Sequence, residues 1–534
     1  MMQTTGETLA PSSPLKLALQ LQRAHMAVSS TEDRKKRGQV FTPPEVCRFM
    51  AGLFTHIPTH FRLLDPGAGV GSLTAAMCEH IAKLRTPRQV ELHLYETDPC
   101  LTPHLRRVIE ECHKILQASG HSLSAHLYKK DFILAHASTM GKARLLFGDD
   151  SKRAGGFDAV IMNPPYFKLA KDSEYTRLLP QIVHGQPNIY TLFLAIGAEL
   201  LRPGGEMVAI TPRSFCSGLY FRAFRRWFFR RMGLGRAHLF LSRKEIFREA
   251  GILQESLITL TTRLGDHPKK ILLSTSYGRD DLIGSATFSL PASEILDDSS
   301  RQLVIRLPEN PIDAEIMRQV ESWPKNFSKR GFRISTGPVV SFRARQFLCH
   351  TYDAASMVPL LLDGSVRRFE TVWPPPRNGK PCALKVTTKS ERLLLLAKNY
   401  VLLRRFSAKE ERRRLTASCL LAGQFPAARV ALENHLNYVY HAAQELSEDE
   451  TYGLAALFNS LLLDRYFRTL SGNTQVNATE IRTMPFPDLE TLADIGRRVR
   501  QLQGISPEET EELVLTTLGI EGQIRRRLLA EAGR

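Results

Sequence analysis

The sequence predicts an α/β fold with a mostly parallel β-sheet, followed by a separate domain of mixed α and β structure. From about residue 34 to 265, short apolar runs alternate with amphipathic stretches, and this alternation is typical of βαβ units. Beyond residue 325, strand-like and helix-like stretches continue without a βαβ rhythm. A chain of 534 residues is long enough for two or three domains.

Apolar runs and amphipathic stretches place the individual elements. We expect strands at residues 63–64, 90–95, 159–162, 207–210 and 257–260, and helices at residues 74–84, 105–116 and 190–201. The pattern divides the chain into a flexible lead-in (1–33), a first domain (34–265), a linker region (266–325) and a second domain (326–534). The linker is predicted from its irregular pattern and from the polar run at residues 297–300.

The motif Asn163-Pro164-Pro165-Tyr166 directly follows the expected strand at residues 159–162. Two prolines stop a strand and stiffen the backbone, and the carboxyl end of a strand is where ligands bind in open α/β sheets. The Asn163 amide oxygen and the Pro164 carbonyl can together accept both hydrogens of an amino group. The Tyr166 ring can stack on the heterocycle that carries this group. Since Asn-Pro also opens ordinary turns, a rigid loop is the alternative for the motif on its own.

A glycine-rich loop, Asp-Pro-Gly-Ala-Gly-Val-Gly at residues 65–71, follows the strand expected at 63–64. Its glycines allow a tight turn and a close approach to a ligand. Glu96 ends the next strand, where a carboxylate can accept hydrogen bonds from ribose hydroxyls. A dinucleotide enzyme would carry similar features. The tight Gly-x-Gly-x-Gly spacing, and Asp65 facing the cofactor's amino-acid end, favour S-adenosylmethionine instead.

Asp131 and Phe132 follow the presumed third strand. The carboxylate of Asp131 can accept a hydrogen bond from an adenine amino group, and Phe132 can pack on the adenine ring. The alternative for Asp131 is the N-cap of a helix.

The formal net charge of +18 suggests a polyanionic partner, most simply nucleic acid, although charge alone leaves a membrane surface open. No stretch approaches 18 consecutive apolar residues, so we expect no transmembrane helix, and the first thirty residues lack the apolar region of a signal peptide. The eight cysteines form no CxxC pair, which predicts reduced thiols with neither a disulfide framework nor a metal site.

Taken in order, these motifs resemble the gamma-class N6-adenine DNA methyltransferases of type II restriction–modification systems, of which the TaqI-type enzyme is the familiar representative. Residues 39–44, Gln-Val-Phe-Thr-Pro-Pro, resemble the first motif of that family. The loop at 65–71, Glu96, the pair Asp131-Phe132 and the motif at 163–166 resemble its cofactor and catalytic motifs. Residues 188–193, 204–215 and 247–255 resemble further segments of its catalytic domain. Looser similarities to its C-terminal specificity region lie at residues 335–340, 400–406 and 457–476. The resemblance covers most of residues 34–490 and includes no nuclease motif.

The resemblance implies a Rossmann-like S-adenosylmethionine-dependent methyltransferase domain, followed by a mixed α+β specificity domain for double-stranded DNA. The residues expected to hold the cofactor are Thr42, Asp65, Gly67, Ala68, Gly69, Gly71, Glu96, Asp131 and Phe132. The residues expected to carry catalysis are Asn163, Pro164, Pro165 and Tyr166. A target adenine flipped out of the duplex is expected to contact Tyr166 and Phe247, with plain core packing as the alternative for Phe247.

Two arginine-rich segments are candidates for contacts with the DNA backbone. The first contains Arg225, Arg226 and Arg230, and the second contains Arg404 and Arg405. Clustered arginines typically neutralise phosphate groups and set the register of a protein on DNA. A solvated helix face is the alternative for any single one of them.

Other functions share the catalytic motif. It also occurs in methyltransferases of RNA adenine and of protein glutamine, and an inactive methyltransferase fold can serve as a DNA-binding subunit. The second domain and the positive charge argue against a glutamine enzyme, and the intact Asp65, Gly67, Glu96 and Asn163 argue against an inactive subunit. The resemblance also implies a monomer in the cytoplasm of a bacterium or archaeon, with the cognate restriction endonuclease as a separate protein.

Overall fold

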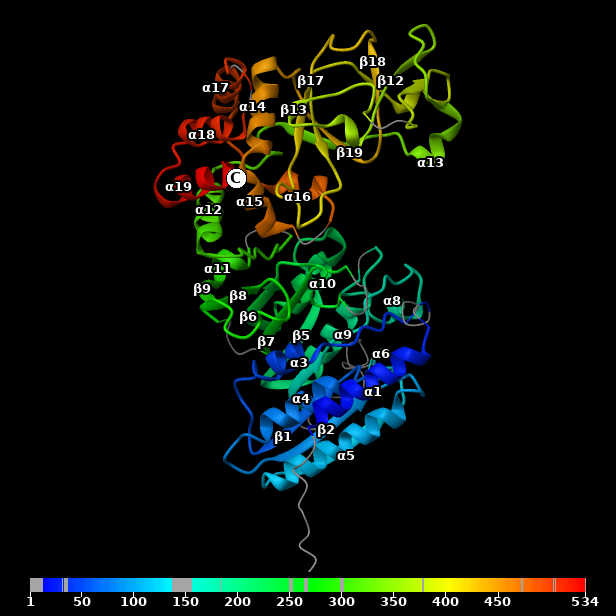
Figure 1. Cartoon of the computed structure of the whole chain (residues 1–534), viewed down its shortest axis with the longest axis vertical. Coiled ribbons are helices and arrows are strands. Elements are labelled where there is room, and N and C mark those ends of the chain that lie inside the picture. Colours follow the sequence, from blue (N-terminus) through cyan, green and yellow to red (C-terminus); the bar gives the residue numbers. More distant parts are fainter. Residues whose placement is uncertain are drawn as a thin grey trace, which may run out of the picture. The chain divides into compact units, whose positions relative to one another are not determined.

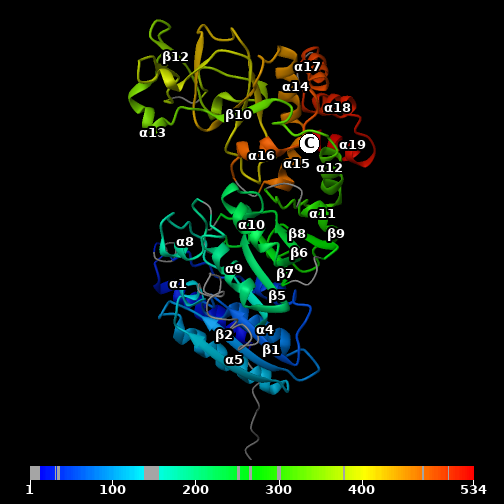
Figure 2. The same cartoon turned by 180° about the vertical axis from the view of Figure 1, so that it is seen from behind.

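A computed structural model describes residues 13–30, 32, 37–136, 156–183, 185–248, 253–263, 268–297, 302–376, 379–471, 474–502, 504 and 506–533. The chain forms two compact units, Met1–Arg306 and Leu307–Arg534. Figures 1 and 2 show the first unit in blue to green and the second in green to red. Within the described residues, no helix is both long and apolar enough to cross a membrane.

Unit 1 is built around a nine-stranded sheet with the strand order β3-β2-β1-β4-β5-β7-β6-β8-β9. Its strands are β1 (His60–Asp65), β2 (Gln89–Tyr95), β3 (Ser122–Tyr128), β4 (Phe157–Met162), β5 (Leu201–Pro212), β6 (Met232–Phe240), β7 (Ser256–Arg263), β8 (Lys270–Ser276) and β9 (Thr287–Pro291). Strands β1 to β5 pair in parallel, whereas β7 runs antiparallel between β5 and β6. The predicted α/β class and the five predicted strands are confirmed.

The helices of unit 1 are α1 (Pro14–Val28), α3 (Pro44–Ala51), α4 (Ser72–Ile81), α5 (Thr102–Ala118), α6 (Phe132–His136), α8 (Glu174–Leu178), α9 (Tyr190–Leu200), α10 (Arg222–Phe228) and α11 (Ala292–Ile295). Helices α4, α5 and α9 confirm the three predicted helices. Helices α1, α3, α4 and α5 share one hydrophobic core with the first strands of the sheet. All six residues of β4 are buried, as expected for a central strand of a parallel sheet with both faces covered.

Two of the predicted boundaries are wrong. Residues 14–28 are helix α1, capped by the Ser13 hydroxyl, which accepts from the Lys16 N–H at 3.2 Å. Because α1 buries Leu15 and Ala18 completely, this part of the lead-in belongs to the folded unit. The expected linker at 266–325 contains β8 and β9, which extend the sheet, and the units divide between residues 306 and 307.

Unit 2 has the mixed α+β structure that the sequence predicts. Two five-stranded sheets have the orders β10-β19-β16-β17-β13 and β11-β14-β12-β18-β15. Their strands are β10 (Phe332–Thr336), β11 (Leu348–Cys349), β12 (Met357–Leu361), β13 (Phe369–Glu370), β14 (Ala383–Lys385), β15 (Leu394–Leu396), β16 (Tyr400–Arg404), β17 (Ala417–Leu420), β18 (Arg429–Leu432) and β19 (Leu436–His441). The helices are α12 (Pro311–Glu321), α13 (Ser341–Ala344), α14 (Glu448–Asn459), α15 (Leu461–Leu470), α16 (Ala478–Thr483), α17 (Leu489–Arg500), α18 (Pro507–Thr517) and α19 (Gly522–Ala532).

Two glycines allow α14 and α17 of unit 2 to pack backbone against backbone. A Cβ atom at Gly453 would overlap the carbonyl oxygen of Leu492, and one at Gly496 would overlap the carbonyl oxygen of Asp449. Neither carbonyl can move without breaking its helix, so each position excludes any larger side chain.

We therefore predict that Gly453→Ala lowers the free energy of unfolding by about 3 kcal/mol, because the new methyl group forces the two helices apart. Thermal and denaturant unfolding measure the effect. The matched control in the same unit is Gly364→Ala, whose added Cβ would lie 3.9 Å from Pro376 in ordinary contact. Equal melting temperatures for the two variants would contradict the close packing.

Candidate active site

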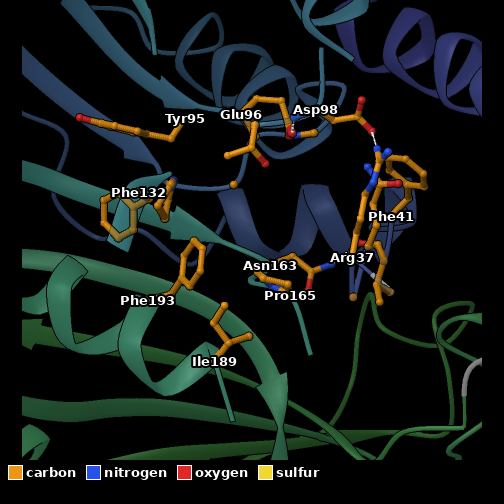
Figure 3. Close-up of a pocket in the computed structure, with 18 of the residues that line it drawn as sticks. Arg37, Phe41, Tyr95, Glu96, Asp98, Phe132, Asn163, Pro165, Ile189 and Phe193 are labelled. Carbon is orange, nitrogen blue, oxygen red and sulfur yellow. Dashed lines mark hydrogen bonds and ion pairs between the residues drawn. The ribbon is translucent and has the colours of Figure 1, made fainter. Parts of the chain in front are cut away.

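A cavity of about 290 Å³ lies at the carboxyl ends of the parallel strands of unit 1 (Figure 3). Each neighbouring strand contributes the segment that follows it, as the rule for open α/β sheets predicts. The lining comprises residues 37–42 ahead of α3, residues 66–70, 72 and 73 after β1, residues 95–98 at the end of β2, residues 130–132 after β3, Asn163, Pro165 and Phe167 after β4, and Tyr175, Ile189 and Phe193.

The glycine loop after β1 is fastened to the end of β2. Gly69 and Gly71 have φ angles of 58° and 91°, a region that L side chains rarely adopt. The Ala68 N–H donates to the Tyr95 carbonyl at 2.9 Å, and the Gly69 N–H donates to Glu96 Oε2 at 2.8 Å. The shape of the loop is therefore set both by its glycines and by the hydrogen bond to Glu96.

Glu96 lies half-buried in the cavity wall, with both carboxylate oxygens engaged by the backbone. Besides the bond from Gly69, its Oε1 accepts from the Asp98 N–H at 2.7 Å. Burial raises the pKa of Glu96. Since each carboxylate oxygen can accept more than one hydrogen bond, Glu96 keeps acceptor capacity for a ligand. Asp98 also pairs with Arg37 at the rim of the cavity (Figure 3).

Asp65 is completely buried beneath the loop and does not line the cavity. Its Oδ2 accepts from the Thr74 hydroxyl at 2.9 Å, whereas Oδ1 has no hydrogen-bond partner. Burial is the main reason that the pKa of Asp65 rises to about 7. Gly71, Pro164 and Tyr166 likewise lie outside the lining. The other predicted cofactor and catalytic residues are in the wall.

Asp131 caps a helix, which is the alternative that the sequence offered, and it also lines the cavity, so its contact with an adenine amino group stays a prediction. Its Oδ1 accepts from the Leu134 N–H at 2.9 Å and so caps α6. Its Oδ2 accepts from the Tyr175 hydroxyl at 2.8 Å, and the residue also lines the cavity. Sequence reasoning missed Tyr175 because it lies in a segment without a predicted element.

An aromatic wall forms the end of the cavity next to Asp131. The rings of Phe132 and Phe193 stack with centroids 5.4 Å apart, and Tyr95 meets Phe132 edge-on at 5.3 Å (Figure 3). Phe193 comes from the first turn of the correctly predicted helix α9, but only the fold shows that it faces the loop after β1. A Cβ at Gly67 would lie 3.9 Å from the Phe193 ring.

The Asn163 amide is held on both sides. Its Nδ2 donates to the Val40 carbonyl and to Thr42 Oγ1, each at 2.9 Å. Its Oδ1 accepts from the Tyr166 hydroxyl at 2.5 Å, and the same hydroxyl lies 3.0 Å from the Ile210 carbonyl. These hydrogen bonds fix the orientation of the amide, with its nitrogen toward residues 40–42 and its oxygen on the opposite side.

Phe247 does not line this cavity and packs in the core, which is the alternative that the sequence offered for it, so its contact with a flipped base stays a prediction. The Phe247 side chain is 2% exposed and packs in the core of unit 1. It borders a separate, smaller cavity of about 120 Å³ beside α1. Phenylalanine is equally suited to a base pocket and to a core, so its sequence position could not separate the two roles.

The prediction that Arg225 contacts DNA is wrong. Arg225 is completely buried. Its guanidinium donates to four carbonyls, those of Phe215, Gly218, Gln302 and Leu303, each at 2.8 Å. Burial lowers its pKa to about 10. Its neighbours Arg226 and Arg230 are exposed.

The second arginine segment is mostly engaged within the protein. Arg404 and Arg405 are half-buried. Arg405 donates to the Asn434 carbonyl at 3.0 Å and to Gln475 Oε1 at 3.2 Å, and Arg404 lies 4.0 Å from Glu411. Their contact with DNA stays a prediction.

The acceptors and rings of the cavity fit S-adenosylmethionine. Glu96 offers acceptors for hydroxyl groups, and Asp131 offers an acceptor beside an aromatic wall. Together with the parallel sheet, these features define the class of protein: a Rossmann-like methyltransferase that depends on S-adenosyl-L-methionine.

Comparison with known proteins identifies the family. The family model described as Eco57I restriction-modification methylase matches residues 81–247. The chain is 34% identical over 493 residues to the type II methyltransferase M.PstI of Providencia stuartii, covering 92% of this chain and 95% of that protein. It is 32% identical over 498 residues to the type II methyltransferase M.BsuBI of Bacillus subtilis, covering 91% and 96%. The chain therefore belongs to the type II methyltransferases of restriction–modification systems and is a DNA methyltransferase.

A solved structure supports the fold alone. The DrdV protein, determined by cryo-electron microscopy as a complex with DNA, matches with a TM-score of 0.50 at 14% identity. The match covers 91% of this chain and 59% of that chain.

Asp65 gives a prediction on pH dependence in the cofactor-free protein. Its carboxyl has a pKa of 3.8 when unperturbed and about 7 when folded, so between these values the unfolded chain is ionised while the folded chain holds the proton. Folding therefore loses stability as the pH rises from about 4 to about 7. We expect Asp65→Asn to gain stability relative to the wild type across this window, by up to about 4 kcal/mol.

Chemical unfolding at a series of pH values measures this difference. Asp172→Asn is the control, because Asp172 is exposed. A difference between Asp65→Asn and the wild type that stays constant from pH 4 to pH 8 would contradict the buried, protonated carboxyl.

Proposed function

We propose that this methyltransferase transfers a methyl group from S-adenosylmethionine to the N6 amino group of adenine in double-stranded DNA. The observation that carries the proposal is the fixed Asn163 amide at the carboxyl end of β4, which lines the cavity with its Nδ2 already engaged. An oxygen acceptor beside a cofactor cavity suits an amino group as substrate, because an amino group can donate hydrogen bonds to it. The resemblance to the N6-adenine enzymes supports the choice of adenine.

Positioning and hydrogen bonding account for the chemistry that this chain supplies. The adenine N6 lone pair is delocalised into the ring, so the amino group is a weak nucleophile. Hydrogen bonds from its two hydrogens to Asn163 Oδ1 and the Pro164 carbonyl would hold it closer to tetrahedral geometry and localise the lone pair. The bound cofactor supplies an electrophilic methyl group on a sulfonium sulfur. The amino proton can leave after transfer, so the site requires no strong base.

The target base reaches this cavity only outside the duplex. Extrusion of a base costs a few kcal/mol, and stacking on an aromatic ring returns about 1–3 kcal/mol. Tyr166 is the proposed platform. Since its hydroxyl is now bound to Asn163 and close to Ile210, a bound amino group would compete with the phenol for Asn163 Oδ1.

In the proposal the enzyme acts as a monomer in the cytoplasm of a bacterium or archaeon, and a cognate restriction endonuclease acts as a separate protein. Light scattering on the purified protein, with and without duplex DNA, tests the monomer. A particle with the mass of two chains would refute it.

We predict that Asn163→Ala lowers the rate of methyl transfer at least about 100-fold, because the amino group loses the acceptor that aligns it. Binding of S-adenosylmethionine is expected to change little, since Glu96 and the aromatic wall are untouched. Transfer of labelled methyl groups to duplex DNA measures the rate, with Asp172→Asn as the control in the segment after the motif.

Mass spectrometry of nucleosides from the methylated DNA then identifies the product. N6-methyladenine supports the proposal, whereas N4-methylcytosine would refute the choice of base. Transfer to RNA or to a protein in preference to duplex DNA would refute the substrate. Near-normal activity of Asn163→Ala would refute the role of the amide.

Three exposed arginines on and just after α10 give a separate prediction for DNA binding. Arg222 and Arg226 lie about one turn apart and share a face of α10, and Arg230 follows just beyond the end of this helix at Phe228; all three are exposed. If each neutralises one phosphate, replacing Arg226 or Arg230 by alanine lowers the slope of log Kd against log salt concentration by about 1. Fluorescence anisotropy with duplex DNA at several salt concentrations measures the slope.

Arg231 is the matched control. It pairs with Glu199 at 3.0 Å and lies over the Trp227 ring at 4.3 Å, so Arg231→Ala should leave the slope unchanged. A slope that is insensitive to Arg226→Ala and Arg230→Ala would exclude these two arginines from the DNA interface.

A further inference from the structure

The segment at residues 39–42 contacts the catalytic amide as well as the cofactor cavity. Thr42 Oγ1 and Asn163 are 121 residues apart in the sequence, yet the hydroxyl oxygen accepts from Asn163 Nδ2 at 2.9 Å. The Val40 carbonyl accepts the other hydrogen of the same nitrogen at 2.9 Å. Both hydrogens of the Asn163 amide are therefore taken up by one short stretch of chain.

This stretch is rigidly anchored. Thr42 is 5% exposed and is followed by Pro43 and by Pro44, the first residue of α3. The Thr42 carbonyl accepts from the Cys47 thiol at 3.5 Å, and Cys47 is completely buried. The helix thus holds the Thr42 backbone in place.

The other end of the stretch lies close to the catalytic motif itself. Gly38 has a φ of +61°, and a Cβ there would lie 2.8 Å from the Phe167 ring and 3.0 Å from the Tyr166 nitrogen. The backbone ahead of Val40 therefore packs directly on the chain that follows Asn163.

The Val40 carbonyl determines which way the Asn163 amide faces, and the Thr42 hydroxyl adds a second hydrogen bond to the orientation that this carbonyl selects. The oxygen and the nitrogen of an asparagine side chain have nearly the same shape, so their neighbours decide the orientation. A carbonyl can only accept, whereas a hydroxyl can accept or donate. In the reversed orientation, Asn163 Oδ1 would face the Val40 carbonyl oxygen with no hydrogen between the two atoms. The observed orientation leaves Oδ1 on the far side, where it accepts from Tyr166.

We propose that Thr42 is a positioning residue for methyl transfer: with the Val40 carbonyl, its hydroxyl oxygen fixes the Asn163 amide so that Oδ1 faces the substrate amino group. The inference rests on the proposed function, in which Asn163 accepts from that group. It gives Thr42 a role beyond the cofactor contact that the family resemblance implies. A cofactor contact governs the affinity for S-adenosylmethionine, whereas a positioning contact governs the rate once the cofactor is bound.

Three variants of the full chain test the proposal. Thr42→Val keeps the shape of the side chain and removes the acceptor, Thr42→Ser keeps the hydroxyl, and Asn163→Ala removes the amide. The measurements are the Kd for S-adenosylmethionine by calorimetry and the single-turnover rate of transfer to duplex DNA at saturating cofactor.

We expect Thr42→Val to lower the single-turnover rate about tenfold, which corresponds to one lost hydrogen bond, while the Kd for S-adenosylmethionine stays within about twofold. Thr42→Ser should restore the rate to within about twofold of the wild type. If Thr42→Val does not fold, Thr42→Ala replaces it as the variant without the hydroxyl, and its rate and Kd are compared with those of Thr42→Ser.

Two outcomes overturn the inference. The first is an unchanged rate in Thr42→Val while Asn163→Ala is inactive. The second is a weaker Kd in Thr42→Val with a normal rate at saturation, which would make Thr42 a cofactor contact alone. A normally active Asn163→Ala would instead overturn the proposed function, so the two failures are distinguishable.

Discussion

The Asn163 amide is the point at which three distant parts of unit 1 meet. It donates to residues 40–42 ahead of α3 and accepts from Tyr166, whose hydroxyl also reaches Ile210 on β5. These bonds require β4 to lie between β1 and β5, and the pairing of Leu64 with Val160 and of Met162 with Ala209 fixes that arrangement. A shift of one residue would turn every side chain of β4 to the opposite face. The register of a fully buried strand therefore places the Asn163 amide at the cavity.

At the end of the cavity near Glu96, a single side chain again both shapes the backbone and lines the site. Glu96 receives two backbone N–H groups, so one carboxylate both shapes the glycine loop and lines the cavity. Burial raises the pKa values of Asp65 and Glu96, and the negative charge of Glu96 raises that of Asp65 further. A cationic neighbour would lower both pKa values again. S-adenosylmethionine carries positive charge at its sulfonium and amino groups, so its charge suits a site with these two carboxyl groups.

Features that depend on residues close together in the sequence could be predicted. Features that depend on contacts between distant segments could not. The apolar runs gave the central strands, and the glycines with Glu96 gave a loop that lines the cavity. The hydrogen bond between Thr42 and Asn163 spans 121 residues, and no local pattern contains it. Strands β8 and β9 were assigned to a linker because their pattern is irregular; only their pairing at the edge of the sheet identifies them.

Arg225 shows the same limit for charge, and it changes how the net charge of +18 is interpreted. Phe224, Arg225 and Phe228 lie on the buried side of α10, whereas Arg222 and Arg226 are exposed. Two of the four carbonyls that Arg225 contacts belong to residues 302 and 303, which are 77 and 78 positions away in the sequence. Arg213 and Arg414 are also buried, at 2% and 1% exposure. A polyanion is attracted mainly by cations that it can approach, so these buried arginines stabilise the fold and contribute little to DNA affinity. Burial, rather than the number of arginines in a segment, separates the two groups; within α10 the position on the helix decides which arginine is buried.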